Sequence, residues 1–221
     1  MPPSRSDVAP AVEPVSDDER ADRADGHEAS ARPSRSVVVA LVLSSAFGLV
    51  ASFTLLLEKI RGLQDPAYRP SCSLNPVVSC GSVMNSEQAG VFGFPNPMIG
   101  VAAFGALVAI ALALVAGARF ARWYWWGMLA GTLFGLGFVH WLIVQSLYEI
   151  NALCPYCMVV WVCTVTAFLA VVSHLIRTSP SRLPGWVRGL PGWAMVIGVI
   201  WVVAVAGLIA ERFWYYWQTL V

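Results

Sequence analysis

Residues 154–176 read CPYCMVVWVCTVTAFLAVVSHLI, an apolar run without acidic residues, lysine or arginine that opens with two cysteines. A transmembrane helix needs about 20 apolar residues to cross roughly 30 Å of hydrocarbon. Pro155 suits the first position of such a helix, because the N–H that proline lacks would have no helical partner there. The stretch therefore predicts a membrane helix over 155–176 with a Cys-x-x-Cys motif, Cys154 to Cys157, at its start.

Four other apolar stretches have the length of a membrane span: about 36–57, 98–117, 124–148 and 193–213. The chain of 221 residues is 57% hydrophobic and 12% charged, whereas a soluble domain carries about twice that charge. Its formal net charge of +1 provides no basic field for nucleic acid. We therefore expect an all-α integral membrane protein in which a fifth transmembrane helix follows a four-helix bundle, with no nucleic-acid partner.

The chain is expected to divide into four segments. Residues 1–35 hold eight of the thirteen acidic residues, among many Pro, Ser and Ala, and predict a disordered cytoplasmic tail. Residues 36–176 would form the four-helix bundle, 177–192 a cytoplasmic loop, and 193–221 the fifth helix with a short extracytoplasmic tail. Because a polar tail precedes a full-length apolar run, we expect the first helix to remain uncleaved.

The basic residues beside the spans predict the orientation, since cytoplasmic loops are enriched in them. One side of the predicted bundle carries Arg32, Arg35, Arg119, Arg122, Arg177, Arg182 and Arg188, and the other carries Lys59, Arg61, Arg69 and Arg212. The more basic side is expected to be cytoplasmic, which places 58–97 and the turn 149–153 outside the cytoplasm. Every cysteine except Cys163 lies in or beside those two segments, in a compartment that permits disulfides.

Two cysteine pairs face this outer compartment. At a helix start, unpaired N–H groups and the helix dipole favour a thiolate at Cys154, and Cys157 lies one turn away, as a thiol-exchange site requires. Cys72 and Cys80 lie in the long outer loop with seven residues between them. The two pairs suggest an electron relay, although a Cys-x-x-Cys motif also occurs in structural disulfides and in zinc sites, which more often use two such motifs. Cys163 is expected to be a small apolar filler.

Other residues in the spans have both a structural and a functional interpretation. Gly127, Gly131 and Gly135 recur every four residues and predict close helix contact on one face. His140 is an ionisable residue inside the third span, which makes it a functional candidate in a membrane, but a lone histidine is more often satisfied by a neighbouring group. Glu58 is expected at the membrane interface, from which it could relay protons.

The order of the motifs resembles the vitamin K epoxide reductase family and its bacterial homologues: Cys72 and Cys80, then Ser86, the run 94–97 (FPNP), and the run 154–157 (CPYC). The resemblance covers about 37–176. The fifth span resembles the extra helix of bacterial members, here without their fused thioredoxin-like domain. The resemblance implies a four-helix bundle that holds a quinone near the outer leaflet, capped by the outer loop and a half-helix.

The resemblance also implies a role for each cysteine. Cys72 would meet the thiol of a partner protein, and Cys80 would pass the electrons inward through a mixed disulfide with Cys154. Cys157 would then face the quinone. The implied partner is a separate DsbA-like protein of thioredoxin fold, the implied electron acceptor is a membrane quinone, menaquinone or ubiquinone, and no metal is implied.

Two polar residues are implied to bind the substrate. Ser86 aligns with a family serine near the quinone, and Asn96 with an asparagine that hydrogen-bonds a quinone carbonyl, where a donor would stabilise the charge that develops during reduction. From the residues alone, Ser86 would cap or back-bond a surface helix and Asn96 would be a turn residue. Trp161 stands where the animal enzymes carry a tyrosine and is expected in the core.

These features predict a thiol:quinone oxidoreductase of the inner or plasma membrane that reoxidises a DsbA-like dithiol and supports disulfide formation in exported proteins. Two alternatives stay open. One is a vitamin K epoxide or quinone reductase that uses another thiol donor. The other is a structural membrane protein of the claudin or tetraspanin kind, whose outer loop also holds a disulfide but which does not need a Cys-Pro-Tyr-Cys motif at a helix start.

Overall fold

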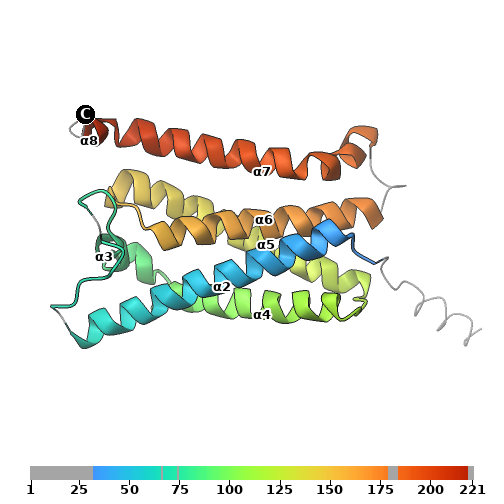
Figure 1. Cartoon of the computed structure of the whole chain (residues 1–221), viewed down its shortest axis with the longest axis horizontal. Coiled ribbons are helices and arrows are strands. Elements are labelled where there is room, and N and C mark those ends of the chain that lie inside the picture. The colour runs from blue at the N-terminus through green and yellow to red at the C-terminus, as the bar shows by residue number, and fades with distance from the viewer. Residues whose placement is uncertain (1–31, 66, 74, 179–183, 219–221) are drawn as a thin grey trace, which may run out of the picture.

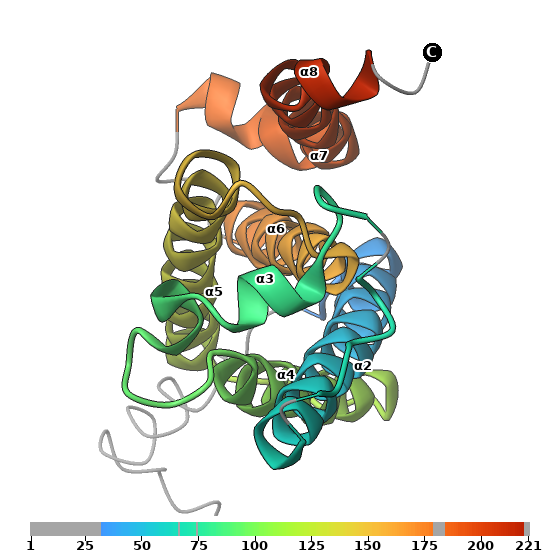
Figure 2. The same cartoon turned by 90° about the vertical axis from the view of Figure 1, so that its left-hand side faces the viewer.

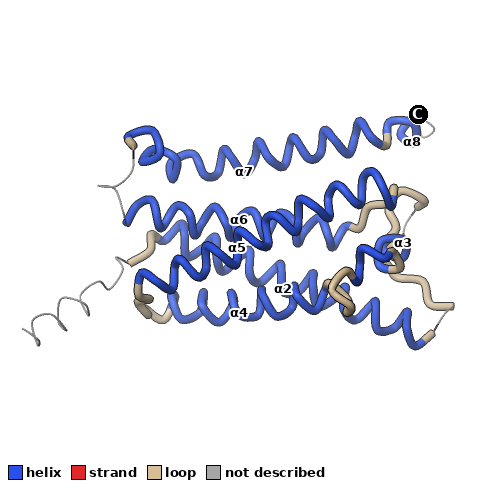
Figure 3. The backbone as a smooth tube through the Cα atoms, turned by 180° about the vertical axis from the view of Figure 1, so that it is seen from behind, coloured by secondary structure: helices blue, strands red, loops and turns tan. Residues whose placement is uncertain are grey.

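The computed structural model describes residues 32–65, 67–73, 75–178 and 184–218. Within these residues every regular element is a helix (Figure 3), and an isolated β-bridge joins Val78 to Leu153. In chain order the elements are α2 (Arg35–Gln64), α3 (Cys80–Met84), η1 (Glu87–Gly90), α4 (Pro97–Val115), α5 (Arg122–Val144), η2 (Gln145–Ile150), α6 (Pro155–Thr178), α7 (Gly185–Arg212) and α8 (Trp214–Trp217). The predicted tail at 1–35 lies almost entirely outside the described residues.

Five helices of the described chain are long and apolar enough to cross a membrane: α2, α4, the continuous run of α5 and η2, α6, and α7. Each corresponds to one of the five predicted spans, so the expected all-α membrane architecture is confirmed. The last helix differs in its start: α7 begins at Gly185, inside the segment expected to be a loop, and contains Pro191. A helix satisfies its own backbone hydrogen bonds, so it can begin before its apolar stretch does.

The helices α2, α4, α5 and α6 form the bundle, and α7 lies outside it against α6 (Figure 1 and Figure 2). Within the bundle, α2 packs on both α4 and α6, and α5 packs on α6. In contrast, α4 and α5 hardly touch each other although they are consecutive in the chain. The ends of α2 and α7 lie together with the starts of α4 and α6, and α3 crosses the bundle there (Figure 2). We call this the cysteine end.

Close helix contact is made by small residues of α2 and α4. A methyl group on Gly48 would overlap the ring of Phe104, and a methyl group on Gly100 would overlap the side chain of Ser52. Such small residues let two backbones approach in a membrane, where the lipid is as apolar as the side chains and packing has to hold the helices together. The two pairs therefore explain why α4 lies so closely along α2.

The prediction for the glycine stripe on α5 is wrong at two of its three positions. A methyl group added to Gly127 or Gly131 would meet no atom within 4 Å, and only at Gly135 would it meet a neighbour, Cγ2 of Thr164 at 3.3 Å. The stripe instead borders the space between α4 and α5. A bare glycine face can meet a helix or an open space, and the spacing of the glycines does not distinguish the two.

Two apolar clusters hold the membrane helices together. Near the end opposite to the cysteines, Leu41, Trp125 and Val171 are at most 1% exposed. Near the cysteine end, a second cluster joins Leu147 of η2 to Phe213, which follows α7. The fifth helix is therefore anchored on the bundle at its cysteine end.

Candidate functional site

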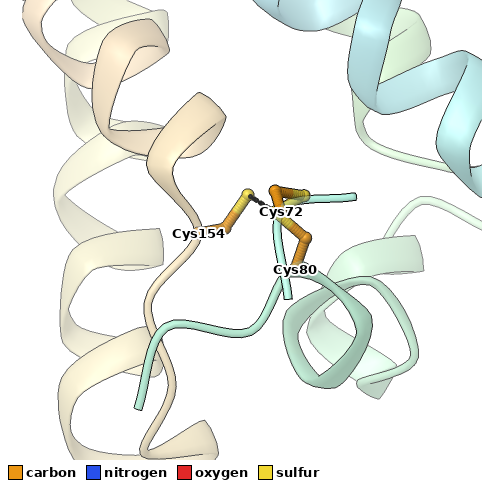
Figure 4. Close-up of side chains that lie close together, drawn as sticks. All are labelled: Cys72, Cys80 and Cys154. Atoms are coloured by element: carbon orange, nitrogen blue, oxygen red, sulfur yellow. Dashed lines mark hydrogen bonds between the residues drawn. A yellow bond between two sulfur atoms is a disulfide. The ribbon is translucent and has the colours of Figure 1, made fainter. Parts of the chain in front are cut away.

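One β-bridge brings the two cysteine segments together. Leu153 donates its N–H to the carbonyl oxygen of Val77 at 2.7 Å, and its own carbonyl accepts the N–H of Ser79 at 2.9 Å. Since Ser79 precedes Cys80 and Leu153 precedes Cys154, this pairing places the two cysteines side by side. Their Sγ atoms are 3.0 Å apart, although 74 residues separate them in the chain (Figure 4).

The outer cysteines are joined to each other. Cys72 and Cys80 form a disulfide with their Cα atoms 5.6 Å apart. Cys80 is the first residue of α3, whose start is capped by the Ser79 hydroxyl as it accepts the N–H of Ser82. Cys72 keeps 6% of its surface exposed, whereas Cys80 has none. Both residues are thus buried, and Cys72 is the less buried of the two.

The three sulfurs of Cys72, Cys80 and Cys154 lie within 4.8 Å of one another. A metal binds thiolates, and a structural zinc site uses four protein ligands, whereas two of these three sulfurs are bonded to each other. A free thiol 3.0 Å from a disulfide is instead the arrangement for thiol–disulfide exchange, in which one sulfur attacks another. The donor set therefore fits exchange chemistry better than it fits a metal.

Cys154 is placed to react as a thiolate. It immediately precedes α6, where a helix leaves N–H groups unpaired. The hydrogen bond from the Cys157 thiol lowers the pKa of Cys154, and the backbone N–H groups of Cys157 and Tyr156 lower it further, while burial acts in the opposite direction without cancelling them. Because the thiolate is the reactive form of cysteine, the lowered pKa favours the reactive form of Cys154.

An apolar cavity of about 500 Å³ lies between α4 and α5 and reaches the inner cysteine pair. Cys157, Ser86 and Asn96 line it near the cysteine end, and the lining continues along α5 and its glycine stripe as far as Trp123. Trp161, which is 2% exposed, also borders it from within the core. A space of this volume is typical of a small-molecule site, so Cys157 of the inner pair borders a potential ligand site.

Backbone carbonyls orient two of the polar residues of the cavity, Ser86 and Asn96. The Ser86 hydroxyl donates to the carbonyl oxygen of Val83 at 2.8 Å, and Nδ2 of Asn96 donates to that of Gln88 at 2.7 Å. Oδ1 of Asn96 is buried without a hydrogen-bond partner in the described part of the chain. Such a buried acceptor is uncommon in folded proteins, and here it belongs to a residue of the cavity wall.

A brace at the end of α2 was not predicted. Glu58, which was expected at the membrane interface, is only 4% exposed, and its carboxylate accepts the hydroxyls of Tyr68 at 2.7 Å and Ser71 at 2.9 Å. The next residue, Lys59, donates to the carbonyl oxygen of Met84 at 2.7 Å. Ser71 adjoins the first cysteine of the outer pair and Met84 ends α3. Two consecutive residues of α2 therefore hold both sides of the outer pair.

His140 has a structural role. Its Nδ1 lies 2.8 Å from the carbonyl oxygen of Leu136, and the indole N–H of Trp201 donates to its Nε2 at 2.9 Å. Since a tryptophan indole can only donate, the proton of His140 sits on Nδ1, and the ring links α5 to α7. Cys163 is buried in α6, more than two turns beyond Cys154, and is not part of the cavity wall.

Comparison with known proteins agrees with this geometry. The model of the vitamin K epoxide reductase family matches residues 39–172, which is more than half of the chain and reaches from α2 to α6. No curated protein sequence matches the chain. Members of this family are membrane proteins that reduce quinones or epoxides with electrons from thiols. The matched region contains both cysteine pairs and the cavity, and the chain therefore belongs to the vitamin K epoxide reductase family of oxidoreductases.

Proposed function

We propose that the protein is a membrane thiol:quinone oxidoreductase that reoxidises a DsbA-like protein of thioredoxin fold, reduces a bilayer quinone and so supports disulfide formation in exported proteins. One observation carries the proposal. Sγ of Cys154 lies 3.0 Å from the outer disulfide, and Cys157, the other member of its pair, lines the cavity. Electrons would then pass from sulfur to sulfur and on to a ligand in the cavity.

In the first step the outer pair takes electrons from the partner. A partner thiolate attacks Sγ of Cys72, the more exposed sulfur of the pair, and Cys80 leaves as a thiolate. The second partner thiol then attacks the mixed disulfide. The partner ends as a disulfide, and Cys72 and Cys80 end as thiols with its two electrons and two protons.

In the second step the electrons move to the inner pair. The Cys80 thiolate attacks Cys154 of a Cys154–Cys157 disulfide and releases Cys157. The Cys72 thiolate then attacks Cys80, which restores the outer disulfide and releases Cys154. The product of this step has an outer disulfide beside two free inner thiols. The structure has the same arrangement, with Cys72 and Cys80 joined and Cys154 and Cys157 free.

In the third step the inner dithiol reduces the quinone. Cys154 and Cys157 give up two electrons and two protons, form a disulfide and leave a quinol. We assign substrate binding to Asn96 and Ser86, two polar residues of the cavity wall near the cysteine end. The second N–H of the Asn96 amide would stabilise the developing charge on a carbonyl oxygen, and a quinol hydroxyl could donate to the buried Oδ1, which has no partner among the described residues.

The shape of the cavity supports a quinone with a long isoprenoid tail, such as menaquinone or ubiquinone. The lining extends far beyond Asn96, along the glycine stripe of α5, and is largely apolar. Because α4 and α5 hardly touch, a tail could enter between them from the bilayer. The open face beside Gly127 and Gly131 provides the width that a chain of isoprene units needs.

We also propose that the cysteine end faces the extracytoplasmic side of the inner or plasma membrane, with the N-terminus in the cytoplasm. Arg119, Arg122 and Arg177 lie at the opposite end of the helices, and cytoplasmic ends are richer in arginine. The outer compartment also permits the disulfide that the site needs. The catalytic bundle would then comprise 36–176, with 193–221 as the fifth helix and an outer tail.

The proposal is tested with the purified protein, a reduced DsbA-like partner and a soluble quinone, with quinol formation followed anaerobically. Quinol should form in proportion to partner disulfide. The Cys163→Ala variant is the matched control, since it removes a cysteine outside the relay and should keep near wild-type turnover. If folded protein forms no quinol with either the partner or dithiothreitol as donor, the proposal is wrong.

A further inference from the structure

The fifth helix is attached to the bundle in an unusual way. Along its length in the membrane α7 buries only one residue, Ile209. Directly after its last turn, however, Phe213 is completely buried among Leu147, Leu153 and Trp161. Although α7 also packs along α6, its burial is concentrated where the chain leaves the helix, next to the segment that leads into Cys154.

Arg212, the last residue of α7, holds this segment by its side chain. Its Nε donates to the carbonyl oxygen of Leu147 at 3.0 Å, and its Nη2 donates to Oδ1 of Asn151 at 2.6 Å. The guanidinium also lies 5.8 Å from the ring centre of Tyr148. A planar guanidinium can bind two acceptors at once in a set direction, so Arg212 fixes two points of the segment relative to each other.

The segment needs such support because its backbone is irregular. The run η2 is a π-helix, and Asn151 follows it with a φ of 54°, in the left-handed region that residues other than glycine seldom adopt. Two residues later, Leu153 forms the β-bridge to the segment before Cys80. The path from Arg212 to the contact between Cys80 and Cys154 is thus short and passes through few residues.

We propose that Arg212 is a positioning residue that sets the contact between Cys80 and Cys154, which makes the fifth helix a part of the electron relay. The inference rests on the proposed function, because the electron relay is what gives the contact between Cys80 and Cys154 a purpose. The hydrogen bonds of Arg212 do not depend on that function. Without Arg212 the segment ahead of α6 would lose two of the hydrogen bonds that fix it, and the bridge at Leu153 would hold Cys154 less often within reach of Cys80. Cys157, on the regular helix α6, would keep its place.

The test measures how readily the two sulfurs join. In a background of Cys72→Ser, Cys157→Ser and Cys163→Ala only Cys80 and Cys154 remain, and diamide can oxidise these two thiols to a disulfide, itself taking up the two hydrogens. The rate is followed by mass spectrometry of alkylated samples. Arg212→Met should slow this cross-link by about tenfold, the order expected when hydrogen bonds from a charged group are lost.

Two further variants separate positioning from general loosening of α7. Trp201→Phe removes the hydrogen bond to His140 in the membrane without touching the segment, and it should cross-link at the wild-type rate. Arg212→Lys keeps the charge but cannot span both acceptors, so its cross-linking rate should lie between those of the wild type and Arg212→Met. This variant decides the question if Arg212→Met does not fold. A wild-type rate in Arg212→Lys, or equal slowing in Trp201→Phe, would overturn the inference.

Activity provides the second readout. With the DsbA-like donor, Arg212→Lys should lower kcat and leave the KM for the partner unchanged, because the partner meets Cys72 and not the inner pair. With dithiothreitol as donor, quinone reduction should stay near wild type. The cross-linking assay needs neither partner nor quinone, so a failure of the proposed thiol:quinone activity and a failure of this inference give different results.

Discussion

The outer and inner cysteine pairs lie in contact but are held in different ways. Cys72 lies in a loop and Cys80 begins the short helix α3, and Glu58 and Lys59 of α2 hold this region on both sides. The inner pair stands at the start of the long helix α6, where the Cys157 thiol and then the N–H groups of Cys157 and Tyr156 lower the pKa of Cys154. The outer pair is therefore held by side chains of another helix, whereas the reactivity of Cys154 depends on its immediate neighbours in the chain.

The largest effect should come from the inner pair. Cys157→Ala removes the sulfur that borders the cavity, so quinone reduction should fall by at least about a thousandfold, roughly 4 kcal/mol of barrier, with the protein partner and with dithiothreitol alike. Quinol absorbance is measured anaerobically, and the enzyme-free reaction of dithiothreitol is subtracted. Substantial quinol formation by this variant would mean that electrons do not pass through the inner pair.

The outer pair should matter for one donor only. Cys72→Ala removes the sulfur that the partner is proposed to attack, so turnover with the DsbA-like protein should fall by about a hundredfold or more. Dithiothreitol is small enough to reach the inner pair, and much of the turnover with this donor should remain. Cys80→Ala should behave in the same way. Normal turnover of Cys72→Ala with the protein partner would contradict the division of roles between the pairs.

The titration of Cys154 tests the activation of the inner pair. Because its pKa is lowered, the thiolate of Cys154 should persist to a lower pH than that of an ordinary cysteine and be lost as the pH falls through the lowered pKa. Below that pKa the thiolate fraction, and exchange with it, should drop about tenfold per pH unit. Thiolate absorbance at 240 nm measures the midpoint.

The Cys157 thiol is the largest cause of the lowered pKa of Cys154. Cys157→Ala should therefore shift the midpoint of the thiolate titration toward higher pH. The matched control is Cys163→Ala, which leaves both members of the inner pair in place and should not move the midpoint. If the Cys157→Ala midpoint stays where it is in the wild type, another group activates Cys154.

The cavity can be narrowed at the glycine stripe. Gly131→Leu would project into the space between α4 and α5 and should raise the KM for a long-tailed quinone by about tenfold, the order of a few lost apolar contacts. The KM for a quinone without a tail should change little. Gly137→Leu, on the same helix but outside the cavity wall, is the matched control. Equal effects of both variants on both quinones would argue against the tail in this cavity.

The smallest effect is expected for the brace of the outer pair. Glu58→Gln keeps the size of the side chain but weakens its bonds to Tyr68 and Ser71, so partner-driven turnover should fall by about threefold to tenfold. Turnover with dithiothreitol should not change, because the inner pair does not depend on the brace. Glu149→Gln, at an exposed glutamate of the same end, should leave both rates unchanged.

One failed prediction and one unforeseen contact show where sequence patterns stop being informative. The glycine stripe on α5 was expected to pack against a helix, yet the close contact is made by Gly48 and Gly100 on α2 and α4. The sequence also did not indicate that Glu58 is buried and bonded to Tyr68 and Ser71. In both cases the residue itself permits either outcome, and the choice depends on which distant segment lies beside it.

Apolar run length, flanking prolines and the spacing of the Cys-x-x-Cys motif were enough to predict five membrane helices and a cysteine pair at the start of α6, because these properties depend on neighbours within a few residues of the chain. The 3.0 Å contact of Cys80 with Cys154 and the cavity at Cys157 were beyond such reasoning. They arise from the β-bridge between Val78 and Leu153, which are far apart in the chain, and from two helices that leave a space between them. Only folding brings those segments together, so only the tertiary structure joins the two pairs into one path.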